Sequence, residues 1–316
     1  MKVVVTGGAG FVGSTLADRL LAEGHEVDVV DDLSTGSLAN LASARAAGGE
    51  FRFHHLDIRS PELVELLARR QPEVIFHMAA QSSVPASVDR PVFDADVNIL
   101  GTLQVLEGAR AAGTSRIVYA ASGGTLYGEP DKSDLPVRES HPHRPVSPYG
   151  VSKKAAIDYL VAYRDLHSIE FTALALANVY GPRQDPRGEA GVVAIFAANL
   201  AEGRASTIFG DGEQTRDFVY VDDVVDAFSR AATHGGGLVL NIATAKETSI
   251  NDLYKAMAAA ARFDQPPRHA PPREGDVRRS SLDAARAAIH LGWKPWTELS
   301  AGAAAVIDYW LCETQA

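Results

Sequence analysis

The sequence predicts an α/β protein whose strands form one doubly wound parallel sheet, with a smaller lobe built from the C-terminal part of the chain. Two observations support this class. Short apolar runs of strand length alternate with helical segments through the first half, and a glycine-rich turn follows the first run directly. We expect residues 1–177 to form the sheet domain and residues 178–316 to form most of the lobe, with a strand at about 238–243 returning to the sheet.

Composition limits the possible functions. The 316 residues are 46% hydrophobic and 22% charged, which is typical of a soluble globular protein with a substantial core. A formal charge of −10 argues against nucleic acid or an anionic membrane as a partner. Cys312 is the only cysteine, so no intrachain disulfide can form, and we expect it to be structural. With no charged leader or long apolar run, we expect a cytoplasmic protein.

The first strand, residues 2–6, runs into the segment Gly7-Gly8-Ala9-Gly10-Phe11-Val12-Gly13, and a helix follows it. The glycines fit two spacings, one beginning at Gly7 and one at Gly8. In either, they allow a tight turn, close approach of the backbone to a pyrophosphate, and close packing of helix on strand. The helix N-terminus adds free N–H groups and a positive dipole.

The second strand, residues 27–30, ends at Asp31 and Asp32. Asp31 lies 18 residues after Gly13, near the interval expected for the acid that binds an adenosine ribose. Together the turn and the acid predict a Rossmann-type dinucleotide site. Carboxylates at this place accept hydrogen bonds from ribose hydroxyls and repel a 2′-phosphate, which favours NAD over NADP.

Further strands are expected at residues 51–54, 74–78 and 117–121. Asp57 follows the first of them, and Ala79-Ala80-Gln81 follows the second, at the edge where such sheets bind ligands. Small alanines there would let a cofactor approach, although packing against a helix explains them equally well. Asn98 lies in a helix where we expect the neighbouring leucines to be core, namely Leu100, Leu103 and Leu106.

A later segment places a phenol beside an ammonium group. Ser147 suits a helix cap and Pro148 the first helical position, so Tyr149 and Lys153 should share one helix face. A neighbouring cation favours the phenolate, which makes Tyr149 a candidate proton acceptor near neutral pH. An ordinary solvated helix would show the same spacing.

The glycine turn, Asp31 and the Tyr149/Lys153 pair together resemble the extended short-chain dehydrogenase/reductase family. Within it the whole chain is most similar to nucleotide-sugar epimerases of the UDP-glucose 4-epimerase type. The resemblance implies tightly bound NAD, a UDP-sugar substrate, Lys153 on the nicotinamide ribose, and Tyr149 as the base for a sugar hydroxyl. The implied NAD-binding residues are Gly7, Gly10, Phe11, Val12, Gly13, Asp31, Asp32, Asp57, Ile58, Ala79, Ala80, Gln81, Asn98, Tyr149 and Lys153.

One position departs from the family pattern. The family's third catalytic residue is a serine four positions before the tyrosine of a Tyr-Gly pair, and Gly123 stands there. Ser122, Thr125 or a water could supply the missing hydrogen bond, and we favour Thr125. Gly123 and Gly124 should also leave room beside the sugar.

The second half carries residues that the resemblance assigns to the substrate. Arg216 would clamp the diphosphate, because a planar guanidinium suits two phosphate oxygens. Arg183 and Arg187 could face a C6 carboxylate, which keeps UDP-glucuronate open as an alternative, although we favour the neutral hexose. The implied substrate-binding residues are Asn178, Arg183, Arg187, Val193, Arg216, Arg273 and Asp276.

Other functions are less well supported. A nucleotide-sugar dehydratase would need an acid pair after Thr125, where Leu126 and Tyr127 stand. A non-catalytic NAD-sensing protein would not need Tyr149 and Lys153. The histidines show no metal spacing. Helices around residues 95–112 and 151–167 could pair between two subunits, so we expect a homodimer.

Overall fold

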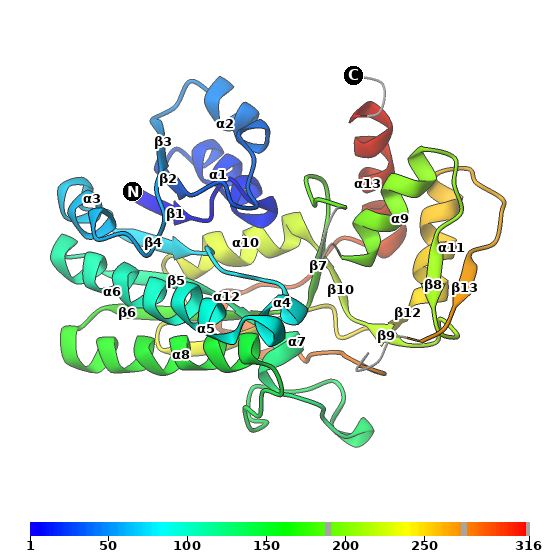
Figure 1. The fold of residues 1–316 in the computed structure, drawn as a ribbon. Coiled ribbons are helices and arrows are strands. Elements are labelled where there is room, and N and C mark those ends of the chain that lie inside the picture. Colours follow the sequence, from blue (N-terminus) through cyan, green and yellow to red (C-terminus); the bar gives the residue numbers. More distant parts are fainter. Residues whose placement is uncertain (187–190, 273–276, 314–316) are drawn as a thin grey trace.

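A computed structural model describes residues 1–186, 191–272 and 277–313. Its centre is a seven-stranded sheet in the order β11-β6-β5-β4-β1-β2-β3, with every neighbouring pair parallel (Figure 1). The strands are β1 (Lys2–Thr6), β2 (Glu26–Asp31), β3 (Phe51–His55), β4 (Val74–His77), β5 (Arg116–Ser122), β6 (Glu170–Leu176) and β11 (Leu238–Ile242). The predicted doubly wound parallel sheet is confirmed.

Helices cover both faces of the sheet, which is why the strands are apolar throughout. Val3 and Val5 of β1 face one hydrophobic cluster and Val4 faces the other, and all three are fully buried. The covering helices are α1 (Phe11–Ala22), α10 (Val221–Ala231) and α12 (Ala285–Leu291) on one side, and α3 (Glu62–Arg70), α6 (Gly101–Ala112) and α8 (Pro148–His167) on the other (Figure 1).

The strand order reverses direction between β1 and β4. In open sheets of this kind, ligands bind outside the carboxyl ends of the strands at such a reversal. Gly7 follows β1 and Ala79 lies just after β4, so the glycine turn and the alanine loop meet at this point. The topology therefore brings the predicted cofactor residues to one edge.

Shorter elements connect this framework. They are α2 (Ala42–Ala46), α4 (Val84–Asp89), α5 (Pro91–Ala95), α7 (Gly123–Leu126), the 3-10 turns η1 (Leu38–Leu41) and η3 (Lys132–Asp134), and the π-helical turn η2 (Asp96–Leu100). The expectation that Leu100 is core was wrong, because it is 54% exposed, whereas Leu106 is buried. The π-helical turn precedes α6, and the extra residue that such a turn accommodates shifts the helical face.

The C-terminal lobe has its own helices and small sheets. The helices are α9 (Val192–Ala201), α11 (Ile250–Ala260) and α13 (Leu299–Glu313). The strand pairs are β7 (Asn178–Tyr180) with β10 (Phe218–Tyr220), β9 (Thr215–Arg216) with β12 (Thr248–Ser249), and β8 (Thr207–Phe209) with β13 (Arg268–Ala270).

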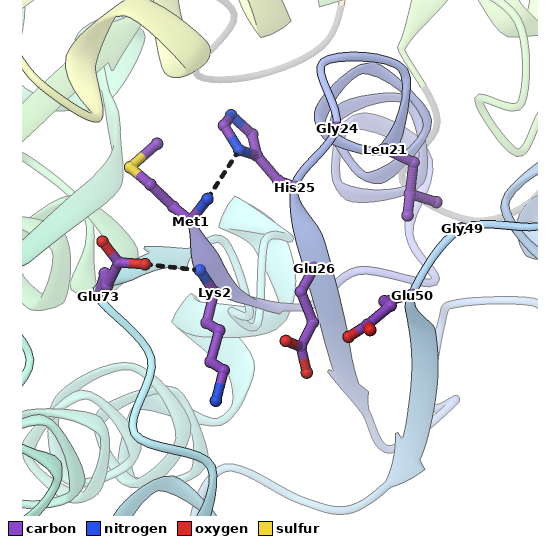
Figure 2. A pocket seen from close by; sticks show the side chains of 9 residues that line it. All are labelled: Met1, Lys2, Leu21, Gly24, His25, Glu26, Gly49, Glu50 and Glu73. Atoms are coloured by element: carbon purple, nitrogen blue, oxygen red, sulfur yellow. Dashed lines mark hydrogen bonds between the residues drawn. The ribbon is translucent and has the colours of Figure 1, made fainter.

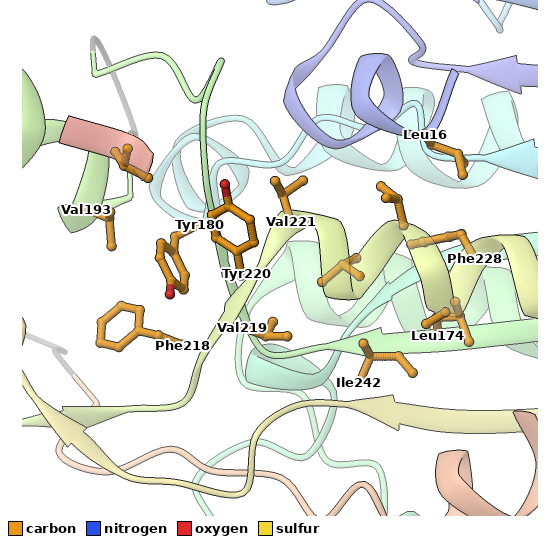
Figure 3. Packing of buried hydrophobic residues seen from close by; sticks show 14 of the residues in the cluster. Leu16, Leu174, Tyr180, Val193, Phe218, Val219, Tyr220, Val221, Phe228 and Ile242 are labelled. Carbon is orange, nitrogen blue, oxygen red and sulfur yellow. The ribbon is translucent and has the colours of Figure 1, made fainter. Parts of the chain in front are cut away.

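One hydrophobic cluster runs from the sheet into this lobe (Figure 3). Leu174 of β6 and Ile242 of β11 belong to it, and so does Tyr180 of β7, whose ring meets those of Phe218 and Tyr220 edge-on. Because the lobe shares its core with the sheet domain, the chain has no thin linker between them. The division at about residue 178 stays a prediction.

Some features of the molecule lie away from the carboxyl edge of the sheet. A pocket at the amino ends of β1 and β2 is lined by Met1, Lys2 and His25 among others, and the amino group of Met1 already lies 3.3 Å from His25 Nδ1 (Figure 2). Cys312 is exposed on α13, and the structural role that we expected for it stays a prediction. Within the described ranges, no helix could span a membrane and no histidine, cysteine or carboxylate cluster could hold a metal.

Candidate active site

Tyr149 and Lys153 lie in the first two turns of α8, close to the carboxyl end of β5. The Ser147 hydroxyl accepts a hydrogen bond from Gly150 N at 3.2 Å and Pro148 opens the helix, so the predicted helix start is confirmed. Lys153 is only 3% exposed and donates to Ala120 O at 3.0 Å. Its Nζ lies 5.7 Å from the centroid of the Tyr149 ring. The structure therefore brings the pair together.

Burial, rather than the neighbouring cation, dominates the electrostatics of this pair. It raises the pKa of Tyr149 to about 12, although a hydrogen bond with Ser122 opposes the rise. It lowers the pKa of Lys153 to about 8, although the charge of Asp94 opposes the fall. Burial outweighs the effect that we expected of the neighbouring cation, and Tyr149 as a proton acceptor near neutral pH stays a prediction. Tyr149 needs a further positive charge beside it to ionise there.

Two hydroxyl-bearing residues, Ser122 and Thr125, lie at the end of β5 and on α7. Ser122, the last residue of β5, shares a side-chain hydrogen bond with it. Thr125 Oγ1, on α7, is buried and has no hydrogen-bond partner among the described residues. Ser122 therefore contacts Tyr149, whereas the Thr125 hydroxyl has no partner among the described residues.

The two glycines between them differ. A Cβ atom at Gly123 would lie 2.3 Å from Leu282 Cδ1 and 3.1 Å from Ala175 O, whereas one at Gly124 would meet nothing within 4 Å. Of the two positions, Gly124 alone has open space around it, and the expectation that this space lies beside the sugar stays a prediction. Leu282 fills the space that a serine side chain at position 123 would need.

The glycine turn after β1 fits a pyrophosphate. Gly7 has φ +68°, and a Cβ atom there would lie 2.6 Å from Ala79 N. A Cβ atom at Gly13 would lie 2.2 Å from Gly7 O. Gly10 precedes α1 and no side chain caps it, which leaves the N–H groups at the start of the helix, those of Phe11 and Val12 included, available to an anion.

Asp31 fixes this turn from the end of β2. Its Oδ2 accepts a hydrogen bond from Ala9 N at 2.9 Å and its Oδ1 one from Leu33 N at 2.8 Å. Burial raises the pKa of Asp31, with these backbone donors opposing the rise. Asp32 similarly accepts from Ser34 N. Each carboxylate oxygen of Asp31 keeps a further lone pair for a ribose hydroxyl.

Asp57 and Ile58 follow β3. Asp57 is already paired, because its carboxylate accepts from Arg59 N at 2.8 Å and from the Arg59 guanidinium, which lowers the pKa of Asp57. Arg59 also reaches Asp96 at 2.7 Å. Ile58 is buried against Gly101, where a Cβ atom would lie 2.6 Å from its Cδ1.

Asn98 holds the loop after β4. Its Oδ1 accepts from Gln81 N and its Nδ2 donates to Gln81 O, both at 2.9 Å. It is 2% exposed, so its role in this structure is to fix the loop that contains Ala79 and Ala80. The Nδ2 group also donates to Asp94, a buried acid on α5 for which no motif spacing gave a signal.

The predicted substrate residues are more scattered. Asn178 is exposed at the start of β7, and Arg216 Nη1 donates to Thr215 O and Val277 O at 2.8 and 2.6 Å. The side chain of Val193 packs in the core (Figure 3). Three predicted positions lie outside the described residues: Arg187, Arg273 and Asp276.

Arg183 faces α1 rather than a sugar carboxylate. Its Nη2 lies 2.7 Å from Asp18 Oδ2, and its Nη1 donates to Ser14 Oγ at 3.3 Å. The ion pair joins the loop after β7 to the helix that begins at the glycine turn. Spacing alone could not reveal this, because the partner lies far away in the sequence.

The fold and these residues define a dinucleotide-binding α/β enzyme with a tyrosine–lysine pair at its carboxyl edge. Comparison with known families makes this specific. The chain belongs to the NAD dependent epimerase/dehydratase family, whose model matches residues 3–243. The predicted family resemblance and the NAD cofactor are confirmed.

Several relatives resemble the chain over its whole length. A UDP-glucose 4-epimerase of Mycolicibacterium smegmatis is 50% identical over 316 residues, covering 100% of both chains. The solved structure of a UDP-glucose 4-epimerase with UDP-glucose from Thermotoga maritima has a TM-score of 0.95 and 41% identity, again covering 100% of both chains. A Thermus thermophilus UDP-glucose 4-epimerase in complex with NAD has a TM-score of 0.90 and 39% identity, covering 98% of this chain and 99% of that one.

Proposed function

We propose that this chain is an NAD-dependent epimerase that inverts C4 of a UDP-hexose, interconverting UDP-glucose and UDP-galactose through a transient 4-keto sugar. The observation that carries this is the contact of Tyr149 with both Ser122 and Lys153 at the carboxyl edge of the sheet. Full-length similarity to UDP-glucose 4-epimerases supports the same reaction and the same nucleotide.

The cofactor residues divide by the part of NAD that they would hold. The N–H groups at the start of α1 suit the pyrophosphate, and Asp31 with Asp32 suits the adenosine ribose. Asp57 and Ile58 would line the adenine, and Lys153 would donate to the nicotinamide ribose. When bound, NAD supplies an oxidised, positively charged ring that accepts a hydride from C4 and returns it.

Tyr149 acts as the base and, on the return step, as the acid. It takes the proton of the 4-hydroxyl as C4 becomes trigonal, and it gives the proton back to the same oxygen after the keto sugar has turned over. Ser122 donates to that oxygen or to the phenolate, and Thr125 Oγ1 is free for a second hydrogen bond to the sugar. The positive charges of Lys153 and of the bound cofactor offset the burial that raises the pKa of Tyr149.

The diphosphate has to stay anchored while the sugar turns over. We assign this to Arg216 and Asn178, with Arg273 and Asp276 as further candidates from the sequence. The UDP-glucuronate alternative loses support, because Arg183 is paired with Asp18. Arg187 remains its one candidate, and Arg187→Ala should leave turnover of UDP-glucose unchanged.

We also propose a homodimer. Val92 and Leu100 are exposed before α6, and Val151, Tyr159 and Leu166 form an exposed apolar stripe along the neighbouring α8. A second copy covering both helices would bury them. Light scattering should give twice the 33.6 kDa of one chain, and Leu100→Asp should shift the mass toward one chain.

The single cysteine fits a reducing compartment, and we propose the cytoplasm.

The test of the reaction is Tyr149→Phe, which keeps the ring and removes the proton acceptor. Parent and variant are incubated with UDP-glucose, UDP-glucuronate and UDP-N-acetylglucosamine in parallel, and C4 inversion is measured. We expect the parent to invert UDP-glucose fastest and the variant to lose ~10²–10⁴ of that rate while binding survives. Unchanged turnover in the variant would refute Tyr149, and inversion of none of the sugars would refute the function.

A further inference from the structure

Asp94 is a buried carboxylate that none of the sequence motifs singled out. It lies on α5, is 0% exposed and accepts three hydrogen bonds, from Ser152 Oγ at 2.6 Å and from Gln81 Nε2 and Asn98 Nδ2 at 2.9 Å each. All three donors are neutral. An acceptor with three donors pointing at it has the surroundings of an ionised carboxylate. Burying a charge without a contacting cation is costly, so this position calls for an explanation.

The three donors come from α8, from the loop after β4 and from η2, which is hydrogen-bonded to that loop. Ser152 stands next to Lys153 on α8, which carries the catalytic pair. Gln81 lies in the loop after β4, and Asn98 of η2 holds that loop through its hydrogen bonds with the Gln81 backbone. The same loop places Ala79 against Gly7. Asp94 therefore ties the catalytic helix to the cofactor loop.

Asp94 also acts on the charge of Lys153. The other titratable groups that face Lys153 are His77 on β4, Tyr119 on β5 and Tyr149 on α8. Burial holds the pKa of His77 at about 3 and raises that of Tyr119 well above its ordinary value, so neither is charged at neutral pH. Within the described ranges, Asp94 is the carboxylate acting on Lys153.

We propose that Asp94 is a positioning residue of the epimerase: its negative charge keeps Lys153 protonated, and its hydrogen bonds hold α8 against the cofactor loop. This inference rests on the proposed function for its kinetic consequence. It assigns to one buried side chain both the protonation state of the catalytic lysine and the alignment of the two segments that meet at the nicotinamide end of the site.

The charge has a consequence for the pH profile that a purely structural role lacks. Burial is the largest influence on the pKa of both catalytic groups. The charge of Asp94 raises both pKa values, which opposes the effect of burial on Lys153 and reinforces it on Tyr149. Removing the charge lowers both values. The acidic limb, set by Tyr149, and the alkaline limb, set by Lys153, should then move together to lower pH.

The experiment compares Asp94→Asn with Ser152→Ala. Asp94→Asn keeps the shape and removes the charge, whereas Ser152→Ala removes one hydrogen bond and leaves the charge. For the parent and both variants, kcat/KM for C4 inversion of UDP-galactose is measured from pH 5.5 to 10. We expect both limbs of Asp94→Asn to shift downward by roughly one pH unit, and the limbs of Ser152→Ala to stay in place while its rate falls.

A second readout needs no turnover. The affinity for NAD should fall as Lys153 loses its proton, and the pH of that fall should also move down in Asp94→Asn. Should this variant not fold, Asp94→Ser, which leaves space for water, is measured in its place with the same expectation. If the limbs of the pH profile and the pH dependence of NAD affinity in the Asp94 variant coincide with those of the parent, the proposed role of Asp94 is overturned. A parent that binds NAD with the expected shift and inverts no UDP-sugar would overturn the proposed function alone.

Discussion

Two glycine-rich turns follow parallel strands of the same sheet, and they lack side chains for different reasons. In the turn after β1, a Cβ atom at Gly7 would meet the backbone of Ala79 and one at Gly13 would meet Gly7 O, so at these two positions the obstacle is main chain. In the turn after β5, a Cβ atom at Gly123 would lie 2.3 Å from the side chain of Leu282 and a looser 3.1 Å from Ala175 O, and one at Gly124 would meet nothing within 4 Å. Gly7 and Gly13 are therefore required by the backbone geometry of the first turn itself. Gly123 is required mainly by the side chain of Leu282, which is distant in the sequence.

This difference decides what each turn tolerates. The atoms met in the first turn are backbone atoms of the segments that directly follow β1 and β4, and they cannot give way without moving those segments. A leucine side chain can change rotamer or be replaced. Substitutions in the first turn should therefore affect cofactor binding, and substitutions in the second should affect local packing and the sugar pocket.

The largest effect is expected from Gly13→Ala. Its Cβ atom would lie 2.2 Å from Gly7 O, so the turn has to open, at a cost of ~1–3 kcal/mol or more. NAD affinity should fall at least about tenfold, measured by titration of the stripped protein. Gly49→Ala is the matched control, because its Cβ atom would make an ordinary 3.4 Å contact with Leu21. Equal affinity in the two variants would remove the distinction between the turns.

A smaller effect is expected from Gly123→Ala. The new methyl group would lie 2.3 Å from Leu282 Cδ1, which should cost ~1–3 kcal/mol of unfolding free energy in urea. In the double variant with Leu282→Ala the clash is gone. The double variant should therefore lose less unfolding free energy than the two single variants lose together. Strict additivity would show that Leu282 is not what excludes a side chain at position 123.

The free energy of unfolding should fall in acid, because a buried histidine, His77, supports the segment next to the first turn. His77 lies between the hydroxyls of Thr6 and Thr102, and Thr6 Oγ1 accepts from Ala79 N. Burial, helped by Lys153, lowers the pKa of His77 to about 3 from its ordinary 6.5, so between these values the unfolded chain binds a proton that the folded protein does not. Stability should thus fall with falling pH by up to ~1.4 kcal/mol per unit. His77→Gln should show a correspondingly shallower dependence in unfolding experiments from pH 7 to 5; parallel curves would contradict a neutral His77.

The smallest effect is expected from Gly124→Ala. Its side chain would enter open space, so the unfolding free energy should change by no more than ~0.5 kcal/mol. A second measurement compares KM for UDP-glucose with KM for the N-acetylated sugar. A large loss of stability would mean that this part of the second turn is as constrained as the first.

The sequence predicted what is local and left out what depends on distant partners. The start of α8, the glycine turn and the acid at the end of β2 follow from spacings of a few residues, because cap, turn and helix-face rules act over that range. Leu282 beside Gly123 and Asp18 beside Arg183 join residues far apart in the chain, and no spacing encodes them.

The degree of burial of individual side chains could not be predicted from the sequence either. The pair of Tyr149 and Lys153 was predicted with the cation dominant, but desolvation outweighs it for both groups. Asp94 was missed because a lone acid in a short helix has no motif, and only its three neutral donors distinguish it. Leu100 was expected in the core, but it lies in the π-helical turn before α6 and is exposed.

The central claim is that C4 is inverted by removal and return of the same hydrogen within one site. The most direct test uses UDP-galactose carrying deuterium at C4, incubated with the purified protein without added NAD, and follows the label in the UDP-glucose formed. The account predicts inversion with the deuterium retained at C4, and loss of inversion in Tyr149→Phe. Inversion with the label exchanged into solvent would mean proton abstraction from carbon and would contradict the account.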